Sequence, residues 1–276
     1  MCIRDRDNIA EGLDGAVVGH PLEDWDDFDS YQPPDPVTQG EGWGPAPDWQ
    51  QRRQACARAK QEGRLAWGYV EHGSMYMRLH YLRGVSNFMI DVATEEPRLD
   101  ELIQSVLSYN MATIEKHLEC GAEIMSFGDD LGFQKSLAIS PVKWRRYIGP
   151  CFRRMFGRCR QADVLIRLHS DGHMLEIIPD LIQYGVTIIN PQIRANGLDG
   201  LEQVAKGRVC VDLDLDRQLF PFVSPQEIKE HIREAVSRLN LPEGGLMLYA
   251  ECEPDIPLAN VRAICEEFDT IGGPGA

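Results

Sequence analysis

Apolar and polar positions alternate in two different patterns along the chain from residue 50 onward. Short, almost continuously apolar runs are separated by longer stretches in which apolar residues recur every three or four positions. The first pattern is typical of strands buried on both faces, and the second is typical of amphipathic helices that cover a sheet. The apolar runs predict six strands, at residues 65–70, 122–127, 164–168, 186–189, 209–213 and 246–249.

Helical patterns fill the intervals between these strands. The longest covers residues 99–119, where Leu99, Ile103 and Ile114 share one apolar stripe. Two helices are expected to begin at Ser-Pro pairs, because serine caps a helix and proline fits its first turn. Further helices are predicted at residues 50–62, 74–83, 140–160 with a kink at Pro150, 174–184, 198–206, 224–239 and 258–268.

Strands that alternate with helices form a parallel sheet, either open or closed into a barrel. A TIM (β/α)8 barrel needs eight strands, and six are visible here. The chain also begins with Met-Cys-Ile-Arg-Asp, which a common sequencing adapter encodes. We therefore predict an α/β fold of the TIM (β/α)8-barrel type, truncated at its N-terminus, with residues 1–5 as an artefact.

Charge divides the chain into two parts. The protein has 43 acidic and 28 basic residues, a net charge of −15. Residues 1–48 hold twelve of the acids and two of the bases, together with many prolines and glycines. This predicts an acidic, irregular lead-in at residues 1–49 and a barrel domain at residues 50–276.

Composition also narrows the range of partners. An acidic chain lacks the positive face that nucleic acids require, and no apolar run is long enough to span a bilayer. The eight cysteines form no CxxC pair, and no secretory signal is visible at the N-terminus. We therefore expect a reduced, cytoplasmic protein with a small-molecule substrate and no nucleic-acid or membrane partner, and a homodimer is the assembly that we consider.

Ionisable or amide side chains follow every predicted strand. The active site of a barrel lies at the carboxyl ends of its strands, so these residues converge on one mouth. The adjacent carboxyl groups of Asp129 and Asp130 repel each other, which suits one of them to proton transfer. The candidate catalytic residues are Asp129, Asp130, His169 and Glu251, and the candidate substrate-binding residues at strand ends are Glu71, Asn190 and Asp212.

The segment His169-Ser-Asp171 places two possible ligands on one face of a strand end, because side chains of a strand alternate. With Cys252 or Glu251, these two residues would form a three-ligand zinc site that keeps one open position. We favour His169, Asp171 and Cys252 as the metal ligands. The alternative is a neutral histidine that is hydrogen-bonded to Asp171.

Four segments resemble the uroporphyrinogen decarboxylase superfamily across residues 65–272. They are Gly121-Ala-Glu-Ile through Asp129-Asp130 to Ile139-Ser-Pro141, then His169-Ser-Asp-Gly172, Gly185-Val-Thr-Ile-Ile189, and Pro254-Asp-Ile-Pro257-Leu-Ala-Asn-Val261. The resemblance implies a TIM barrel. It also implies one of two activities: decarboxylation of a porphyrinogen without a cofactor, or zinc-dependent methyl transfer with a corrinoid protein.

The residues of the resemblance differ between these two branches. His80 stands where the decarboxylases have a tyrosine, so we count it as a substrate-binding residue. His169 matches a zinc ligand of the methyltransferases, while Asp171 replaces a cysteine and Cys252 lies near the position of a second one. We favour a corrinoid-linked, cobalamin-dependent methyltransferase acting on a small methylated substrate. The alternatives are a uroporphyrinogen III decarboxylase in porphyrin biosynthesis and an inactive barrel that serves as a binding subunit.

Overall fold

The computed structural model describes residues 6–7, 16–40 and 45–272. The chain forms two compact units. Unit 1 consists of Met1–Asp130 and Ile139–Leu168, and unit 2 consists of Leu131–Ala138 and His169–Ala276. Residues 1–5, expected to be an artefact, lie outside the described residues, and the division at residue 50 stays a prediction.

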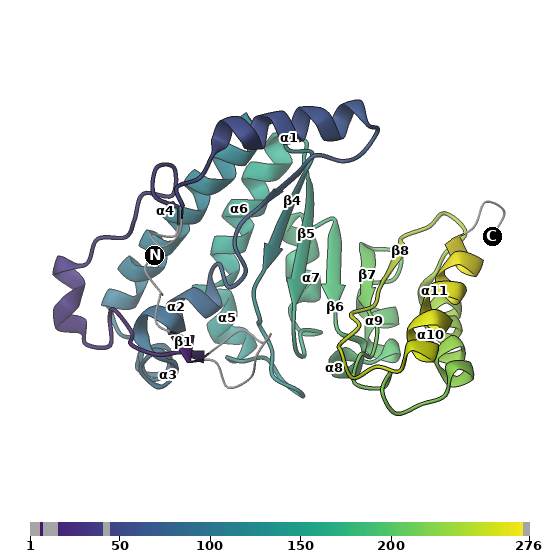
Figure 1. Cartoon of the computed structure of the whole chain (residues 1–276). Helices are drawn as coiled ribbons and strands as arrows, with labels where there is room; N and C mark the ends of the chain where they lie inside the picture. Colours follow the sequence, from purple (N-terminus) through teal and green to yellow (C-terminus); the bar gives the residue numbers. More distant parts are fainter. Residues whose placement is uncertain (1–5, 8–15, 41–44, 273–276) are drawn as a thin grey trace. The chain divides into compact units, whose positions relative to one another are not determined.

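All six predicted strands are present, with ends shifted by a few residues. They lie in the order β3-β4-β5-β6-β7-β8 (Figure 1). Within unit 1, β3 and β4 pair in parallel, with Trp67 opposite Ile124. Within unit 2, β6, β7 and β8 pair in parallel, with Val211 opposite Leu246. The strands are β3 (Trp67–Tyr69), β4 (Ile124–Gly128), β5 (Leu165–Ser170), β6 (Ile188–Pro191), β7 (Cys210–Asp214) and β8 (Leu246–Tyr249).

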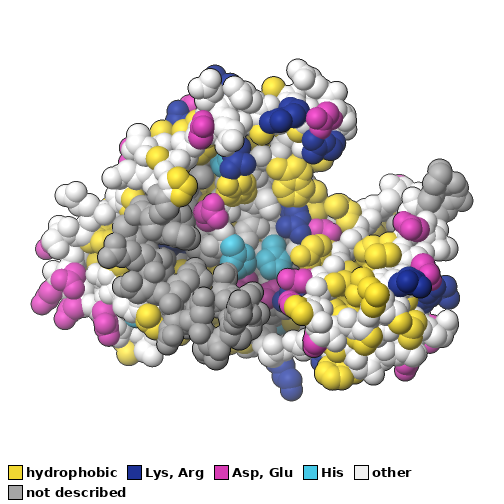
Figure 2. Space-filling view, in the orientation of Figure 1, with side chains coloured by type: hydrophobic (Ala, Val, Ile, Leu, Met, Phe, Trp, Pro, Cys, Tyr) yellow, Lys and Arg dark blue, Asp and Glu magenta, His cyan; other side chains and the backbone are white. Residues whose placement is uncertain are grey.

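These strands confirm a parallel α/β sheet, but not a closed barrel of eight strands. The end strands of the described sheet are β3 and β8. Every second side chain of these two strands is exposed, namely Trp67 and Tyr69 on β3 and Met247 and Tyr249 on β8. Figure 2 shows hydrophobic side chains gathered at the surface of unit 2. Each of these two strands therefore has partly exposed apolar side chains on one of its faces.

Unit 1 surrounds its strands with helices whose apolar stripes follow the sequence pattern. The longest, α4, buries Leu99, Leu102, Ile103, Val106, Leu107 and Ile114 along one side. The sequence did not predict α3, whose last turn ends at Glu95 in a left-handed conformation. The helices of unit 1 are α1 (Trp49–Gln61), α2 (Tyr76–Arg83), α3 (Val85–Thr94), α4 (Arg98–Glu119), α5 (Pro141–Tyr147) and α6 (Gly149–Gln161).

The predicted kink at Pro150 is a complete break between two helices. Proline lacks the backbone N–H that would continue the helix, but it fits the first turn of a new one. The chain therefore ends α5 at Tyr147 and begins α6 at Gly149. There is no room for a side chain at Gly149, because a Cβ atom would press against the ring of Trp144.

The described part of the acidic lead-in has more structure than an irregular segment. It contains two short antiparallel strands, β1 (Arg6–Asp7) and β2 (Ala16–Val17), and a 3-10 helix, η1 (Trp25–Ser30). Leu22 is fully buried, and the indole N–H of Trp25 donates to Asp91 of α3 at 3.1 Å. Asp91 also binds Arg83 at 2.8 Å. The lead-in therefore packs on α2 and α3 as part of unit 1.

Unit 2 has its own helical layer. In α10 the buried residues Ile228, Ile232, Ala235 and Leu239 form one stripe. Arg233 of α10 binds the buried carboxylate of Glu267 in α11 at 2.7 Å. Its helices are α7 (Ile178–Tyr184), α8 (Ile193–Asn196), which the sequence did not predict, α9 (Leu198–Val204), α10 (Pro225–Leu239) and α11 (Leu258–Gly272). No helix among the described residues is long and apolar enough to cross a membrane.

Candidate functional site

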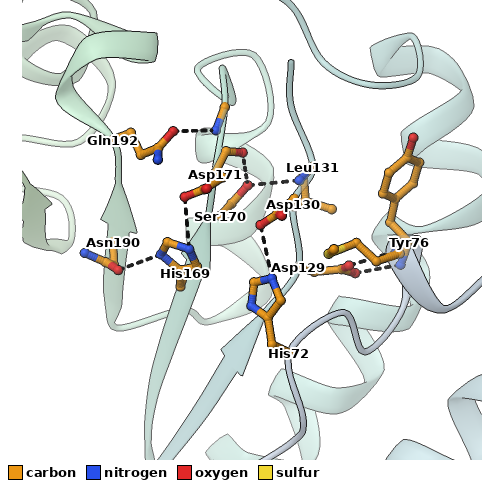
Figure 3. A network of polar contacts seen from close by, with 12 residues as sticks. His72, Tyr76, Asp129, Asp130, Leu131, His169, Ser170, Asp171, Asn190 and Gln192 are labelled. Carbon is orange, nitrogen blue, oxygen red and sulfur yellow. Dashed lines mark hydrogen bonds and ion pairs between the residues drawn. The ribbon is translucent and has the colours of Figure 1, made fainter. Parts of the chain in front are cut away.

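A polar network joins the carboxyl ends of neighbouring strands in unit 2 (Figure 3). His169, near the end of β5, has its Nδ1 2.7 Å from Oδ1 of Asn190 on β6. The Nδ2 of Asn190 donates to the backbone carbonyl of Asp212 on β7 at 2.6 Å. This second bond fixes the orientation of the amide, so its oxygen faces the imidazole. His169 Nδ1 must therefore carry the proton of the first bond.

The other ring nitrogen of His169 faces a carboxylate. Its Nε2 lies 3.2 Å from Oδ1 of Asp171. An imidazole nitrogen and a carboxylate oxygen at this distance attract each other when the nitrogen carries a proton. Arg217 extends the network by binding Asp171 at 3.4 Å and by forming an ion pair with Glu251, beyond the end of β8. The predicted residues His169, Asp171, Asn190 and Glu251 thus belong to one network.

Asp214, at the end of β7, is a functional candidate that was not among the residues predicted from the sequence. It is 2% exposed, and its Oδ1 has no hydrogen-bond partner among the described residues. Burial raises the pKa of this carboxyl group to about 6, against the opposing charges of Arg217 and His169. Asp214 and the predicted Asp212 lie two positions apart, so strand alternation places both on the same face. That spacing was the signal that could have found it.

The predicted zinc ligands do not come together. Among the described residues, His169, Asp171 and Cys252 do not bring three ligand atoms within 4.8 Å of one another. Cys252 is exposed, and the pKa of its thiol is raised by partial burial and by the neighbouring Cys265. A catalytic zinc site generally needs three protein ligands. The imidazole and carboxylate pair alone does not fit that requirement, so no chemical step is assigned to zinc.

The adjacent carboxylates Asp129 and Asp130 of unit 1 have separate environments (Figure 3). Asp129 is fully buried and accepts backbone N–H bonds from Met75, Tyr76 and Met77 at 2.6–3.1 Å. It satisfies the free N–H groups at the start of α2, and burial raises its pKa to about 6. Asp130 is partly exposed, and its Oδ1 lies 3.3 Å from Nε2 of His72. The pair is therefore not a dyad, and Asp129 has a structural contact.

The remaining candidates of unit 1 are Glu71 and His80. Glu71 is exposed and lines a cavity beside β3. His80 lies among the rings of Tyr76, Tyr81 and Phe88, and its two buried ring nitrogens have no hydrogen-bond partner among the described residues. Burial lowers the pKa of His80 to about 4, so its ring is neutral. Their role in substrate binding stays a prediction.

A close contact between two glycines holds the loop that carries Asp171. Gly172 has φ +79°, and a Cβ atom there would overlap the carbonyl group of Gly132. A Cβ atom at Gly132 would in turn overlap the backbone of His173. The N–H of Gly172 donates to Gln192 at 3.0 Å. Asp171 is therefore held by backbone contacts on one side and by Arg217 on the other.

Proteins with a parallel α/β sheet commonly bind their ligands at the carboxyl ends of the strands, where this polar network lies. The family described as "Uroporphyrinogen decarboxylase (URO-D)" matches residues 8–271, which is most of the chain. The protein therefore belongs to the URO-D family. This agrees with the superfamily that the four sequence segments indicated. No curated protein matches its sequence.

Solved structures that match part of the chain include three dihydropteroate synthases. The enzyme from Xanthomonas albilineans with 4-aminobenzoic acid has 18% identity and a TM-score of 0.44, over 63% of this chain and 65% of that one. The Yersinia pestis enzyme in a sulfonamide drug complex has 16% identity and a TM-score of 0.44, over 75% of this chain and 71% of that one. The Vibrio fischeri enzyme has 17% identity and a TM-score of 0.41, over 61% of this chain and 66% of that one. The chain thus spans slightly less than two thirds of the first of these proteins, and likeness at this level assigns no activity.

Proposed function

We propose that this URO-D-superfamily protein is an enzyme of the methyltransferase type, which acts on a small methylated substrate together with a separate corrinoid protein. The observation that supports this choice is the charge of the strand-end network in unit 2. Four carboxyl groups, those of Asp171, Asp212, Asp214 and Glu251, accompany Arg217 and His169 there. Such a site favours a neutral or cationic methyl donor.

The same charge disfavours the main alternative. A porphyrinogen that loses carboxyl groups is itself a polyanion, and its binding needs cations that are free to receive carboxylates. Arg217 already binds Asp171 and Glu251, and Arg194 binds Asp216 at 2.8 Å. A polycarboxylate would therefore have to displace carboxylates of the protein. Methyl transfer between small molecules requires no such exchange.

In the proposed reaction, His169 and Asp214 handle protons. The bond from His169 Nδ1 to Asn190 fixes the ring, so Nε2 is the atom that exchanges a proton beside Asp171. Asp214, with its pKa near 6, changes its protonation close to neutral pH. A pair of groups of this kind can activate a methyl acceptor or protonate a leaving group. No step of this reaction uses zinc, and metal analysis of the purified protein tests the predicted zinc content independently.

The test compares two reactions in one preparation. Wild-type protein is assayed for methyl transfer from a panel of amine, alcohol and thioether donors to cob(I)alamin, and for decarboxylation of uroporphyrinogen III. We expect methyl transfer, and we expect His169→Gln to lower its rate about 100-fold or more. The matched control is His173→Gln, because His173 binds Ala195 and Glu176 outside the network.

Three results would contradict the proposal. Decarboxylation without methyl transfer would assign the chain to the alternative branch. A folded protein without either activity would favour the binding subunit. Equal loss of activity in the His169 and His173 variants would remove the assignment of His169.

A further inference from the structure

Unit 1 contains a cavity of about 580 Å³ that belongs to no candidate discussed so far, apart from Glu71 on its wall. Its walls come from α1, the end of β3 and the second half of α4, and we call it the α1–α4 cavity. The volume lies in the range of small-molecule sites. All of its lining residues belong to unit 1.

One wall of the α1–α4 cavity presents an arginine in a fixed position. Arg52 of α1 donates to the hydroxyl of Tyr69 at 2.5 Å, and its guanidinium lies 4.6 Å from the centre of the Tyr69 ring. Among the described residues, the Arg52 side chain donates a hydrogen bond to Tyr69. Its other guanidinium N–H groups can therefore donate to a ligand. Arg58 and Arg78 also line the cavity, against the acids Asp48 and Glu71. Asp48 is occupied in capping α1.

Aromatic rings form the second part of the wall. The imidazole of His117 lies 5.3 Å from the ring of Trp49 and 5.1 Å from the ring of Tyr69. His117 is 2% exposed, and its Nδ1 has no hydrogen-bond partner among the described residues. A buried imidazole nitrogen without a partner is costly for a structure. Tyr69 is 36% exposed, so part of its ring is open to a ligand.

We propose that the α1–α4 cavity binds a small planar aromatic carboxylate, whose ring lies against Tyr69 and whose carboxylate pairs with Arg52. The planar guanidinium binds a carboxylate through two parallel hydrogen bonds, and its place over the Tyr69 ring sets the geometry in advance. The exposed tyrosine ring offers a stacking surface to a planar ligand. The unpartnered Nδ1 of His117 is available to a polar ring substituent. This site does not depend on the function proposed above.

The test is calorimetric titration of the full chain with 2-naphthoate and with the uncharged 2-naphthamide. We expect 2-naphthoate to bind about tenfold or more tightly than the amide, because only the carboxylate forms the charged pair with arginine. Arg52→Gln should abolish this preference. Arg53→Gln is the matched control, because Arg53 is the next residue of α1, is exposed and does not line the cavity.

A second variant separates binding from folding. Tyr69→Leu removes the ring and should weaken both probes, and each variant is compared with the wild type by circular dichroism and urea unfolding. The proposal is overturned if the wild type binds neither probe at millimolar concentration, or if it binds both equally. It is also overturned if Arg53→Gln weakens 2-naphthoate as much as Arg52→Gln does, since the effect would then be one of general positive charge.

Discussion

Asp214 combines a buried position with a carboxyl group that ionises near neutral pH. Its pKa is raised to about 6 by burial, so the ionised form is less favourable in the folded protein than in the unfolded chain. The stability associated with its protonated form is present below pH ~4 and is lost as the pH rises through 6. The folded protein therefore carries an electrostatic cost at pH 8.

Replacing Asp214 by asparagine should remove this cost. We expect Asp214→Asn to raise the free energy of unfolding by about 2 kcal/mol at pH 8 and to change it little at pH 4. Urea unfolding at both pH values measures the difference. Asp216→Asn is the control, because Asp216 is partly exposed and paired with Arg194. Under our proposal the Asp214 variant also loses methyl transfer, whereas lower stability at pH 8 would contradict the role of burial.

At the scale of elements, the start of α2 depends on a side chain that is distant in sequence. Three successive backbone N–H groups at this helix end donate to Asp129, which directly follows β4. Without that carboxylate, buried donors would remain unpaired. We expect Asp129→Ala to lower the free energy of unfolding at pH 7 by about 1–3 kcal/mol.

The neighbouring residue provides the control. Asp130 is partly exposed and its ion pair with His72 is 3.3 Å long, so Asp130→Ala should cost less than about 1 kcal/mol. Urea unfolding compares the two variants. Equal losses would show that Asp129 does not act as the anchor of α2.

The start of α10 is stabilised locally instead. Ser224 accepts from the N–H of Glu227, and the Glu227 carboxylate accepts from the Ser224 N–H, which forms a capping box. Ser224→Ala should destabilise the protein by about 1 kcal/mol in thermal or urea unfolding. Ser237→Ala, in the exposed last part of the same helix, should have an effect within about 0.5 kcal/mol. A larger effect of the control would contradict this reading of the cap.

The elements also show how far the sequence could lead. Continuous apolar runs located all six strands. The expected burial on both faces holds for β4 and β6, but β3 and β8 have alternate side chains exposed. Strand alternation placed Asp171 beside His169 correctly. It could not place Cys252, because the chain leaves strand geometry after Tyr249 and a side chain there no longer has a defined face. Nor could it show that Asp129 serves α2, since that contact joins residues more than fifty positions apart.

At the scale of the whole molecule, acid sensitivity should be unequal between the two units. Burial lowers the pKa of both His80 and His117 to about 4, and both lie in unit 1. The unfolded chain binds protons on these rings first, so stability is lost as the pH falls from ~6.5 towards 4. In unit 2, burial also lowers the pKa of His231. The raised pKa values of Asp129 and Asp214 make the opposite contribution to stability as the pH falls, and each unit contains one of these two residues.

We therefore expect amide hydrogen exchange to increase in unit 1 before unit 2 when the pH is lowered from 7 to 5, after correction for the intrinsic rate. Mass spectrometry of peptic peptides measures this for both units in one sample. The double variant His80→Phe and His117→Phe should remove the difference, because phenylalanine keeps a ring without a titrating group. An unchanged pH response in that variant would locate the acid sensitivity elsewhere.

The contact between Gly132 and Gly172 has a consequence for sequence variation. Each position lacks space for a Cβ atom because the backbone of the facing loop occupies it. In a library of all single substitutions, both positions should therefore tolerate glycine alone, although neither glycine has a reactive group. A substitution at either one would push Asp171 away from His169 without changing any member of the polar network. Loss of activity in variants of these two glycines would then reflect a changed distance between Asp171 and His169. A sequence logo of functional variants would show two invariant glycines together with a histidine and an aspartate.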